Sequence, residues 1–305
     1  NREKSWFSLT SVAVSLRTAP ITPIVAQEID SFILNNPALE PKMSKKTLTL
    51  AAMTLVSGAV FAQAAPETTL TFNAGVVTDY RYRGITQSRN EAAVQGGVDY
   101  AHKSGFYVGA WASTIKWIAD YSYSGGTKTG TDISGNMELD VYGGYKFDLS
   151  KDLTLDVGVL RYQYVGNTLE MTGGRSRLNY GDANTNEVYT AITMGPITAK
   201  YSYSLSDLFG YIDSKGSGYF DLSANFEVIP TWTVTPHFGR QTVTAARYNA
   251  SYNDMALTVT KDLGKGLSAS LGYYGTTAEI SNYSSTFDGK YLGERGAVLG
   301  VKYNF

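Results

Sequence analysis

Three charged residues, Asp79, Arg81 and Arg83, stand at alternate positions of one short segment. Side chains two residues apart point to the same face of an extended strand. Charges that share a face can form ion pairs with the neighbouring strand, and on the wall of a water-filled passage they can select among ions. We therefore treat these residues as candidates for a constriction, with Asp99 on the next strand as their expected partner.

Further charged residues fall on the same inward face of the strands predicted below. They complete a candidate pore-lining set of Asp79, Arg81, Arg83, Asp99, Glu138, Asp140, Lys146, Asp156, Lys200, Asp221, Glu227 and Lys302. Glu187 adds another inward acid, so acids outnumber bases and a slight preference for cations is expected. A solvated wall with local ion pairs explains the same pattern, and the sequence leaves both interpretations open.

Catalytic chemistry has little support in the chain. It has two His and no Cys, which excludes disulfides and thiolate sites. His102 falls in a predicted turn and His237 at an inward position, whereas outer-membrane lipases with twelve strands place Ser and His on the lipid-facing exterior. There is no Gly-x-Ser-x-Gly pattern and no clustered His, Asp and Glu with metal-ligand spacing. We expect no enzyme activity, no metal and no cofactor.

The elements that position the charged residues are predicted to be β-strands. From Leu70 onward apolar and polar residues alternate with a period of two, as in the segment 221–228. In one strand the alternation breaks near Leu160 and Arg161, which indicates either a bulge or an error in the predicted register. Twelve strands are predicted near 69–83, 91–101, 105–116, 136–147, 152–165, 187–195, 197–207, 217–228, 231–240, 251–262, 266–277 and 294–305.

The connections between these strands alternate strictly between short and long. The long ones are 84–90, 117–135, 166–186, 208–216, 241–250 and 278–293. Outer-membrane barrels have short periplasmic turns and long outer loops. The sequence therefore predicts an all-β fold: a single closed antiparallel transmembrane β-barrel with an up-and-down meander of about twelve strands. The loops 117–135 and 166–186 either fold inward as gates or are flexible, and we expect flexibility.

Composition agrees with this fold class. The 305 residues are 43% hydrophobic and only 17% charged, with a net charge of −1 that predicts no attraction to nucleic acid. After residue 65 no apolar run approaches the roughly 18 residues that a membrane-spanning helix needs.

The first residues read as targeting sequence. Lys45 and Lys46 precede an apolar segment over 47–61, and the small residues that follow predict cleavage between Ala64 and Ala65. Residues 43–64 are thus predicted to be a signal peptide and 65–305 the barrel. Residues 1–42 are expected to be a disordered, mistranslated upstream extension, with a genuine extra segment as the alternative.

The segment from Gly75 to Ser113 resembles the TorF family of outer-membrane porins. The resemblance is carried by the runs 77–84 (VTDYRYRG), 95–100 (QGGVDY) and 104–109 (SGFYVG). It implies an outer-membrane barrel that passes small solutes. The final residues, Tyr303 and Phe305, also resemble the terminal aromatic signal that barrel assembly machinery recognises.

The combined expectation is a porin-like channel in the outer membrane of a Gram-negative bacterium, for passive diffusion of small hydrophilic solutes or ions. A structural or adhesive barrel with a plugged lumen is the main alternative, and an outer-membrane enzyme is the lesser one. The expected partners are outer-membrane lipid, the barrel assembly machinery, periplasmic chaperones and the solutes themselves.

Overall fold

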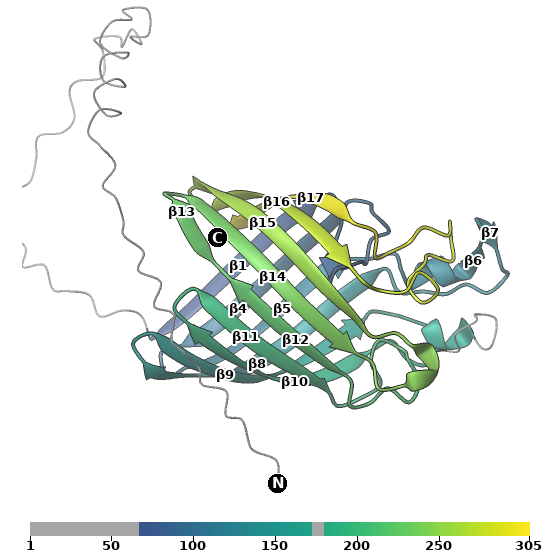
Figure 1. The fold of residues 1–305 in the computed structure, drawn as a ribbon, viewed down its shortest axis with the longest axis horizontal. Helices are drawn as coiled ribbons and strands as arrows, with labels where there is room; N and C mark the ends of the chain where they lie inside the picture. The colour runs from purple at the N-terminus through teal and green to yellow at the C-terminus, as the bar shows by residue number, and fades with distance from the viewer. Residues whose placement is uncertain (1–66, 173–179) are drawn as a thin grey trace, which may run out of the picture. The chain divides into compact units, whose positions relative to one another are not determined.

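The computed structural model describes residues 67–172 and 180–305 of the chain (Figure 1). The predicted extension 1–42, the predicted signal peptide 43–64 and the cleavage site between Ala64 and Ala65 all lie outside these residues.

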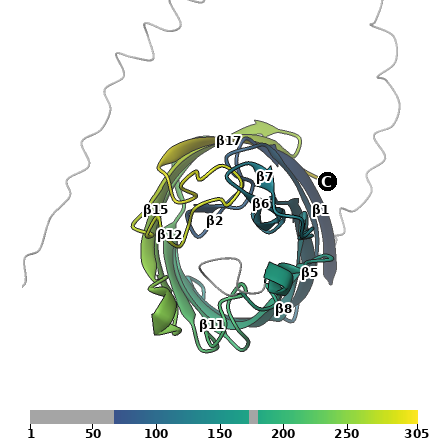
Figure 2. The same ribbon diagram turned by 90° about the vertical axis from the view of Figure 1, so that its right-hand side faces the viewer.

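A single antiparallel sheet closes on itself and forms a barrel (Figures 1 and 2). The strands of the wall are β1 (Thr68–Val77), β4 (Ala93–His102), β5 (Phe106–Thr114), β8 (Met137–Ser150), β9 (Leu153–Tyr164), β10 (Thr185–Met194), β11 (Ile197–Ser204), β12 (Gly218–Ala224), β13 (Phe226–Ile229), β14 (Trp232–Thr242), β15 (Tyr252–Gly264), β16 (Leu267–Thr276) and β17 (Gly296–Asn304).

Closure comes from the pairing of β1 with β17, where Val76 lies opposite Val301. β12 and β13 pair with β14 in one register from Gly218 to Glu227, with a shift only near the turn at Ile229, so they are two halves of one strand interrupted at Asn225. The wall therefore has twelve strands in up-and-down order, which confirms the predicted fold class. Closure leaves no open sheet edge, which is the condition that a bilayer imposes on strands.

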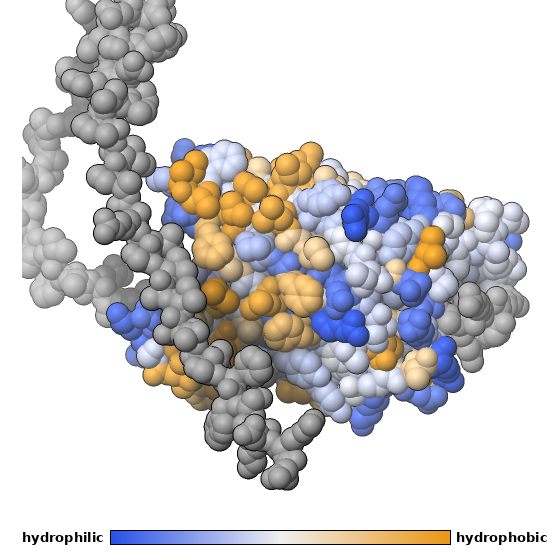
Figure 3. All heavy atoms as spheres, in the orientation of Figure 1, coloured by the Kyte–Doolittle hydropathy of each residue, from blue (hydrophilic) through white to orange (hydrophobic). Residues whose placement is uncertain are grey.

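The predicted alternation sorts side chains between the two faces of the wall. The outward positions carry exposed apolar residues, among them Leu70, Val94, Val159, Ile192 and Leu299. Figure 3 shows apolar side chains gathered over the strands of the visible face, with hydrophilic ones toward the end that carries the long loops. Within the described residues, no helix is long and apolar enough to cross a membrane.

One predicted irregularity is absent. The ladder on both sides of β9 runs without a shift through Leu160 and Arg161, so the predicted bulge is wrong. Arg161 lies on the outer face, near the long-loop end of β9. Its guanidinium donates to Asn186 Oδ1 at 3.1 Å and to Gln163 Oε1 at 2.7 Å. The polar residue thus follows from a polar outer rim, not from a change of register.

The first strand also differs from its prediction. β1 ends at Val77, not at residue 83. The chain then leaves the wall and forms a small hairpin of β2 (Arg81–Tyr82) and β3 (Ile85–Thr86), which lies inside the ring of strands in Figure 2. Asp79, Arg81 and Arg83 are therefore not on a wall strand, although they do lie within the barrel.

The loop 115–136 has a defined structure. It contains the 3₁₀ turn η2 (Ala119–Ser122) and a second hairpin, β6 (Tyr123–Ser124) with β7 (Thr127–Lys128). Ser285 and Thr286 in the loop 277–295 donate hydrogen bonds to Asp120. Two further 3₁₀ turns, η3 (Leu169–Thr172) and η4 (Ala246–Tyr248), lie in other long loops.

Candidate functional site

The tip of the inner hairpin is a tight turn formed by Arg83 and Gly84. Both residues have positive φ, 47° and 77°. Two successive left-handed residues make a type I′ turn, the type that suits a two-residue hairpin. A Cβ on Gly84 would lie 2.5 Å from Thr276 Cγ2 and 2.7 Å from Asp254 Cβ. The hairpin tip thus approaches β15 and β16 so closely that only glycine fits.

Arg83 anchors this tip to the opposite wall. Its Nη2 donates to both carboxylate oxygens of Glu187 on β10, at 2.9 and 2.8 Å, and its Nη1 donates to Gln241 Oε1 on β14 at 2.7 Å. The guanidinium also lies 4.3 Å from the ring centroid of Tyr219 on β12. The side chains of Arg83 and Glu187 are 4% and 2% exposed. Arg83 is therefore a buried, multiply bonded anchor.

The base of the hairpin is held by a second set of polar contacts. Asp79 accepts from Arg81 Nε at 2.6 Å and from Ser88 Oγ at 3.0 Å. Tyr80 Oη donates to Glu138 Oε1 on β8 at 2.9 Å. The contacts of the hairpin thus reach strands all round the ring, from β8 to β16. The hairpin therefore crosses the lumen and does not lie along one wall.

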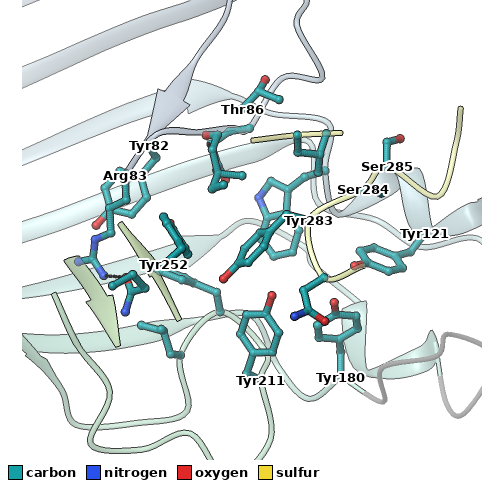
Figure 4. Close-up of a pocket in the computed structure, with 18 of the residues that line it drawn as sticks. Tyr82, Arg83, Thr86, Tyr121, Tyr180, Tyr211, Tyr252, Tyr283, Ser284 and Ser285 are labelled. Carbon is teal, nitrogen blue, oxygen red and sulfur yellow. Dashed lines mark hydrogen bonds between the residues drawn. The ribbon is translucent and has the colours of Figure 1, made fainter. Parts of the chain in front are cut away.

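Two cavities lie on either side of this hairpin, and Tyr82 and Arg83 line both. The loop-side cavity has a volume of about 90 Å³ and is lined mainly by aromatic rings from the long loops (Figure 4). The turn-side cavity has a volume of about 430 Å³ and is lined by charged residues of the wall. The hairpin is therefore the partition between an aromatic chamber and a charged chamber.

The turn-side cavity contains part of the predicted pore-lining set. The members that line it are Arg81, Arg83, Asp140, Lys200 and Asp221. His237, also inward as predicted, bonds Asp221 Oδ2 through Nε2 at 2.8 Å. Lys200 lies 4.0 Å from the ring centroid of Tyr189.

Other predicted residues lie elsewhere in the lumen. Asp156 accepts from Tyr107 Oη at 2.6 Å, and Lys146 lies 5.3 Å from the same tyrosine ring. Asp99 accepts from Tyr142 Oη. Within the described residues Asp99 pairs with none of Asp79, Arg81 and Arg83, because those residues leave the wall and take other partners.

Two predicted residues lie near the short turns, far along the wall from the hairpin. Glu227 Oε1 accepts from the backbone N–H of Thr231 at 3.0 Å in the turn between β13 and β14. Lys302 lies opposite Ser268 at the start of β16. On the outer face, the exposed rings of Tyr303 and Phe305 lie 4.8 Å apart.

The sequence does not single out the wall residues that contact the hairpin. Glu187 is recognisable as an inward acid, but nothing in its neighbourhood singles it out. Gln241 and Tyr219 carry no charge, and neither does Tyr162, whose Oη accepts from Arg83 Nη2 at 3.4 Å. A search for charged inward positions therefore passes over all three. Their only signal is inward parity, which they share with every second residue of the wall.

Known proteins similar to this chain include one bacterial family and several solved barrels. A family model described as a bacterial protein of unknown function, Gcw_chp, matches residues 61–305. No curated protein matches the chain. A KdgM porin, solved in complex with disordered oligogalacturonate, is 7% identical with a TM-score of 0.45, over 78% of this chain and 99% of that one. A NanC porin is 11% identical with a TM-score of 0.45, over 77% and 99%. An outer-membrane channel from Pseudomonas putida F1 is 13% identical with a TM-score of 0.44, over 81% and 98%.

Proposed function

The chain belongs to the Gcw_chp family of bacterial proteins, and for this member of it we propose the role of an outer-membrane channel for small hydrophilic solutes or ions. The constriction of this channel is the Arg83 hairpin, defined as residues 78–92. The resemblance of residues 75–113 to the TorF porins agrees with the proposal.

The observation that carries the proposal is the inverted polarity of a closed wall. Apolar residues such as Val159 and Leu299 are 57% and 58% exposed on the outer face. Charged residues such as Asp140, Lys200 and Asp221 face a cavity inside. A soluble barrel would bury its apolar face, whereas a lipid-embedded one exposes it and keeps a polar interior. A polar interior in a membrane is the minimum that a passage for hydrophilic solutes requires.

The hairpin also favours a second candidate, a structural barrel whose lumen is plugged. Its contacts with β8, β10 and β14 span the lumen. The two candidates differ in what the hairpin does: in a channel it narrows a path or moves aside, and in a plugged barrel it stays in place.

Single-channel recording in planar lipid bilayers separates these candidates. We expect discrete conductance steps from the purified protein, and larger steps when the anchor residue Arg83 is replaced. A barrel that gives no steps, with or without its hairpin, would refute the channel and favour the structural role. Arg247 pairs with Asp213 at 3.2 Å on an exposed loop, so Arg247→Ala serves as the control for loss of an arginine.

The selectivity follows from the acid excess on the inward face. Outside the hairpin and its partner Glu187, the predicted inward acids outnumber the predicted inward bases. The acids are Asp99, Glu138, Asp140, Asp156, Asp221 and Glu227, and the bases are Lys146, Lys200 and Lys302. We propose a slight preference for cations, measured as the reversal potential under a salt gradient. A reversal potential of the opposite sign would overturn the preference while leaving the channel itself intact.

We also propose that Tyr303 and Phe305 form the signal for barrel assembly. Both rings are exposed on the outer face, 41% and 67%, where another protein can contact them. Replacing both by alanine is expected to lower the yield of assembled barrel in cells. If refolding of the same variant into lipid vesicles is also impaired, the residues act on barrel stability instead of on recognition.

A further inference from the structure

We propose that the loop-side cavity is a binding site for a neutral, single-ring aromatic compound that carries a hydrogen-bond acceptor oxygen. The inference goes beyond the proposed passage of hydrophilic solutes. It concerns the chamber on the other side of the hairpin, and binding there does not require the channel to conduct.

The first support is the aromatic lining of the cavity. Nine of its lining residues are aromatic: Tyr82, Trp117, Tyr121, Tyr164, Tyr180, Phe209, Tyr211, Tyr252 and Tyr283. Figure 4 shows the rings of Tyr121, Tyr211, Tyr252 and Tyr283 arranged around the space. They meet edge to face, as in the Tyr252–Tyr283 pair at 5.1 Å between ring centroids. Offset and edge-to-face contacts are the geometries in which another ring is favoured.

The second support is a pair of donors without partners. Trp117 Nε1 and Arg83 Nε are both buried, and neither has a hydrogen-bond partner among the described residues. Both residues line the cavity. A buried donor that loses its contact with water carries a penalty unless an acceptor replaces that water. An acceptor oxygen on the ligand would satisfy one of these donors, which an unsubstituted hydrocarbon ring cannot do.

The charge balance of the cavity selects a neutral ligand. Arg83 is the one charged residue in its described lining, and the carboxylate of Glu187 already neutralises it at 2.8 Å. A carboxylate-bearing ligand would bring a second negative charge beside Glu187 in a poorly hydrated space. A phenol brings the oxygen without that charge.

The volume limits the ligand to one ring. A cavity of about 90 Å³ is smaller than the roughly 150 Å³ engineered cavity that binds benzene. A small adjustment of the loop residues Asn282 to Thr286, which close one side, therefore accompanies entry of a ring. Fused rings and chains of linked rings do not fit.

The test uses 4-fluorophenol as the probe, with fluorine NMR of the purified full-length protein in detergent. We expect saturable broadening of the fluorine signal. Trp117→Phe keeps an aromatic ring but removes the indole donor, and we expect about tenfold weaker binding, the effect of one lost hydrogen bond. Trp232 lies at a short turn and lines neither lumen cavity. Trp232→Phe is therefore the matched control and is expected to bind like the unmodified protein.

Leu208 lines the cavity and is 2% exposed. Two substitutions of this residue distinguish binding in the cavity from partition of the probe into detergent micelles. Leu208→Trp fills the space and is expected to abolish the saturable part, so the remaining broadening measures partition into micelles. Leu208→Ala enlarges the space and is expected to admit 2-naphthol, which the unmodified protein excludes. A difference in electrophoretic mobility between unheated and heated samples shows whether each variant is folded.

Equal broadening in the unmodified protein and in folded Leu208→Trp would overturn the proposal. So would tighter binding of 4-fluorobenzoate than of 4-fluorophenol, because it would require an anion site. Cyclohexanol, which has the oxygen without the aromatic face, is expected not to compete. Competition by cyclohexanol would show that the cavity accepts any small alcohol and would overturn the aromatic preference.

Discussion

At the scale of single residues, Arg83 connects the hairpin to the barrel. Its guanidinium uses one nitrogen for Glu187 and another for Gln241, and the rings of Tyr82 and Tyr219 lie within 4.9 and 4.3 Å of it. A buried ion pair is weak evidence for stability, because desolvation offsets its attraction. Loss of one partner is different, since the other charge then stays buried alone. The pair is better understood as a device that fixes the position of the hairpin.

Arg83→Met tests this positional role. The change leaves Glu187, 2% exposed, without its cation, and such a loss typically costs about 3–5 kcal/mol. We expect the hairpin tip to leave β10, the single-channel conductance to rise, and the urea midpoint to fall. The double variant Arg83→Met with Glu187→Met removes both charges and is expected to recover most of the stability while the conductance stays high. Recovery of the original conductance by the double variant would contradict the proposal that this ion pair holds the hairpin in position.

Gly84 offers a second residue-scale test that leaves all charges in place. A side chain at this position would meet Thr276 and Asp254 at less than 3 Å, and its positive φ adds strain. Gly84→Val is therefore expected to push the hairpin tip away from β15 and β16 and to raise the conductance. The valine also disfavours the type I′ turn itself. Gly130 also has positive φ, but a Cβ added there would meet no atom within 4 Å. It supplies the control Gly130→Val, for which the conductance is expected not to change.

At the scale of elements, the strands are predictable and the hairpin is not. Alternation and the short–long order of the loops predict all twelve wall strands, because each strand has one apolar face and one polar face. The segment 77–84 (VTDYRYRG) continues the same alternation beyond Val77. An alternation with a period of two is expected for any extended chain. It does not show whether that chain is paired with a neighbouring strand of the wall. Alternation alone therefore predicts a first strand that runs to Arg83, whereas β1 ends at Val77 and Arg83 lies in the turn after β2.

For a related reason, the sequence does not reveal which wall residues contact the hairpin. Contacts such as Tyr80 with Glu138 and Arg83 with Glu187 join residues 58 and 104 positions apart. Neither partner has a local motif, because the geometry that unites them belongs to the closed ring. The predicted inward residues were thus useful as a description of the wall, but the sequence could not show which of them meet the hairpin.

Removing the hairpin tests its function as an element. Val77 and Ala93 are paired across β1 and β4, so an Asn-Gly turn can replace residues 78–92 without disturbing either strand. We expect an assembled barrel with several-fold higher conductance, measured in planar bilayers. Shortening the β6–β7 hairpin is the control, because its residues line neither lumen cavity. Unchanged conductance after removal of residues 78–92 would place the constriction elsewhere.

At the scale of the whole molecule, the fold depends on a wall whose apolar side faces outward. The backbone is satisfied by closure of β1 on β17, so the wall needs no partner sheet and no apolar core through its length. The loop-end cluster, which includes Ile118, Leu169 and Leu208, is the main buried apolar region of the part of the chain that the structure describes. The consequence is that two neighbouring residues of one strand should respond oppositely to the same charge.

Leu257 and Thr258, near the middle of β15, make this comparison. Leu257 is 51% exposed on the outer face, and Thr258 lines the turn-side cavity. Leu257→Lys places a charge at the centre of the apolar belt, where such a change costs about 2–4 kcal/mol in a bilayer. Thr258→Lys places the same charge in a hydrated lumen, where we expect little loss of stability and a shift of the reversal potential toward anions. Unfolding by urea in lipid vesicles and bilayer recording measure the two effects.

The outcome of this pair distinguishes the membrane from other environments, because the two substitutions differ only in the face they modify. In a soluble barrel Leu257→Lys would be as harmless as any exposed lysine. A large loss of stability in lipid vesicles, absent in Thr258→Lys, therefore requires lipid on the outer face and water on the inner one. Equal tolerance of both lysines would contradict the membrane-spanning barrel, and with it the channel whose passage that barrel would enclose.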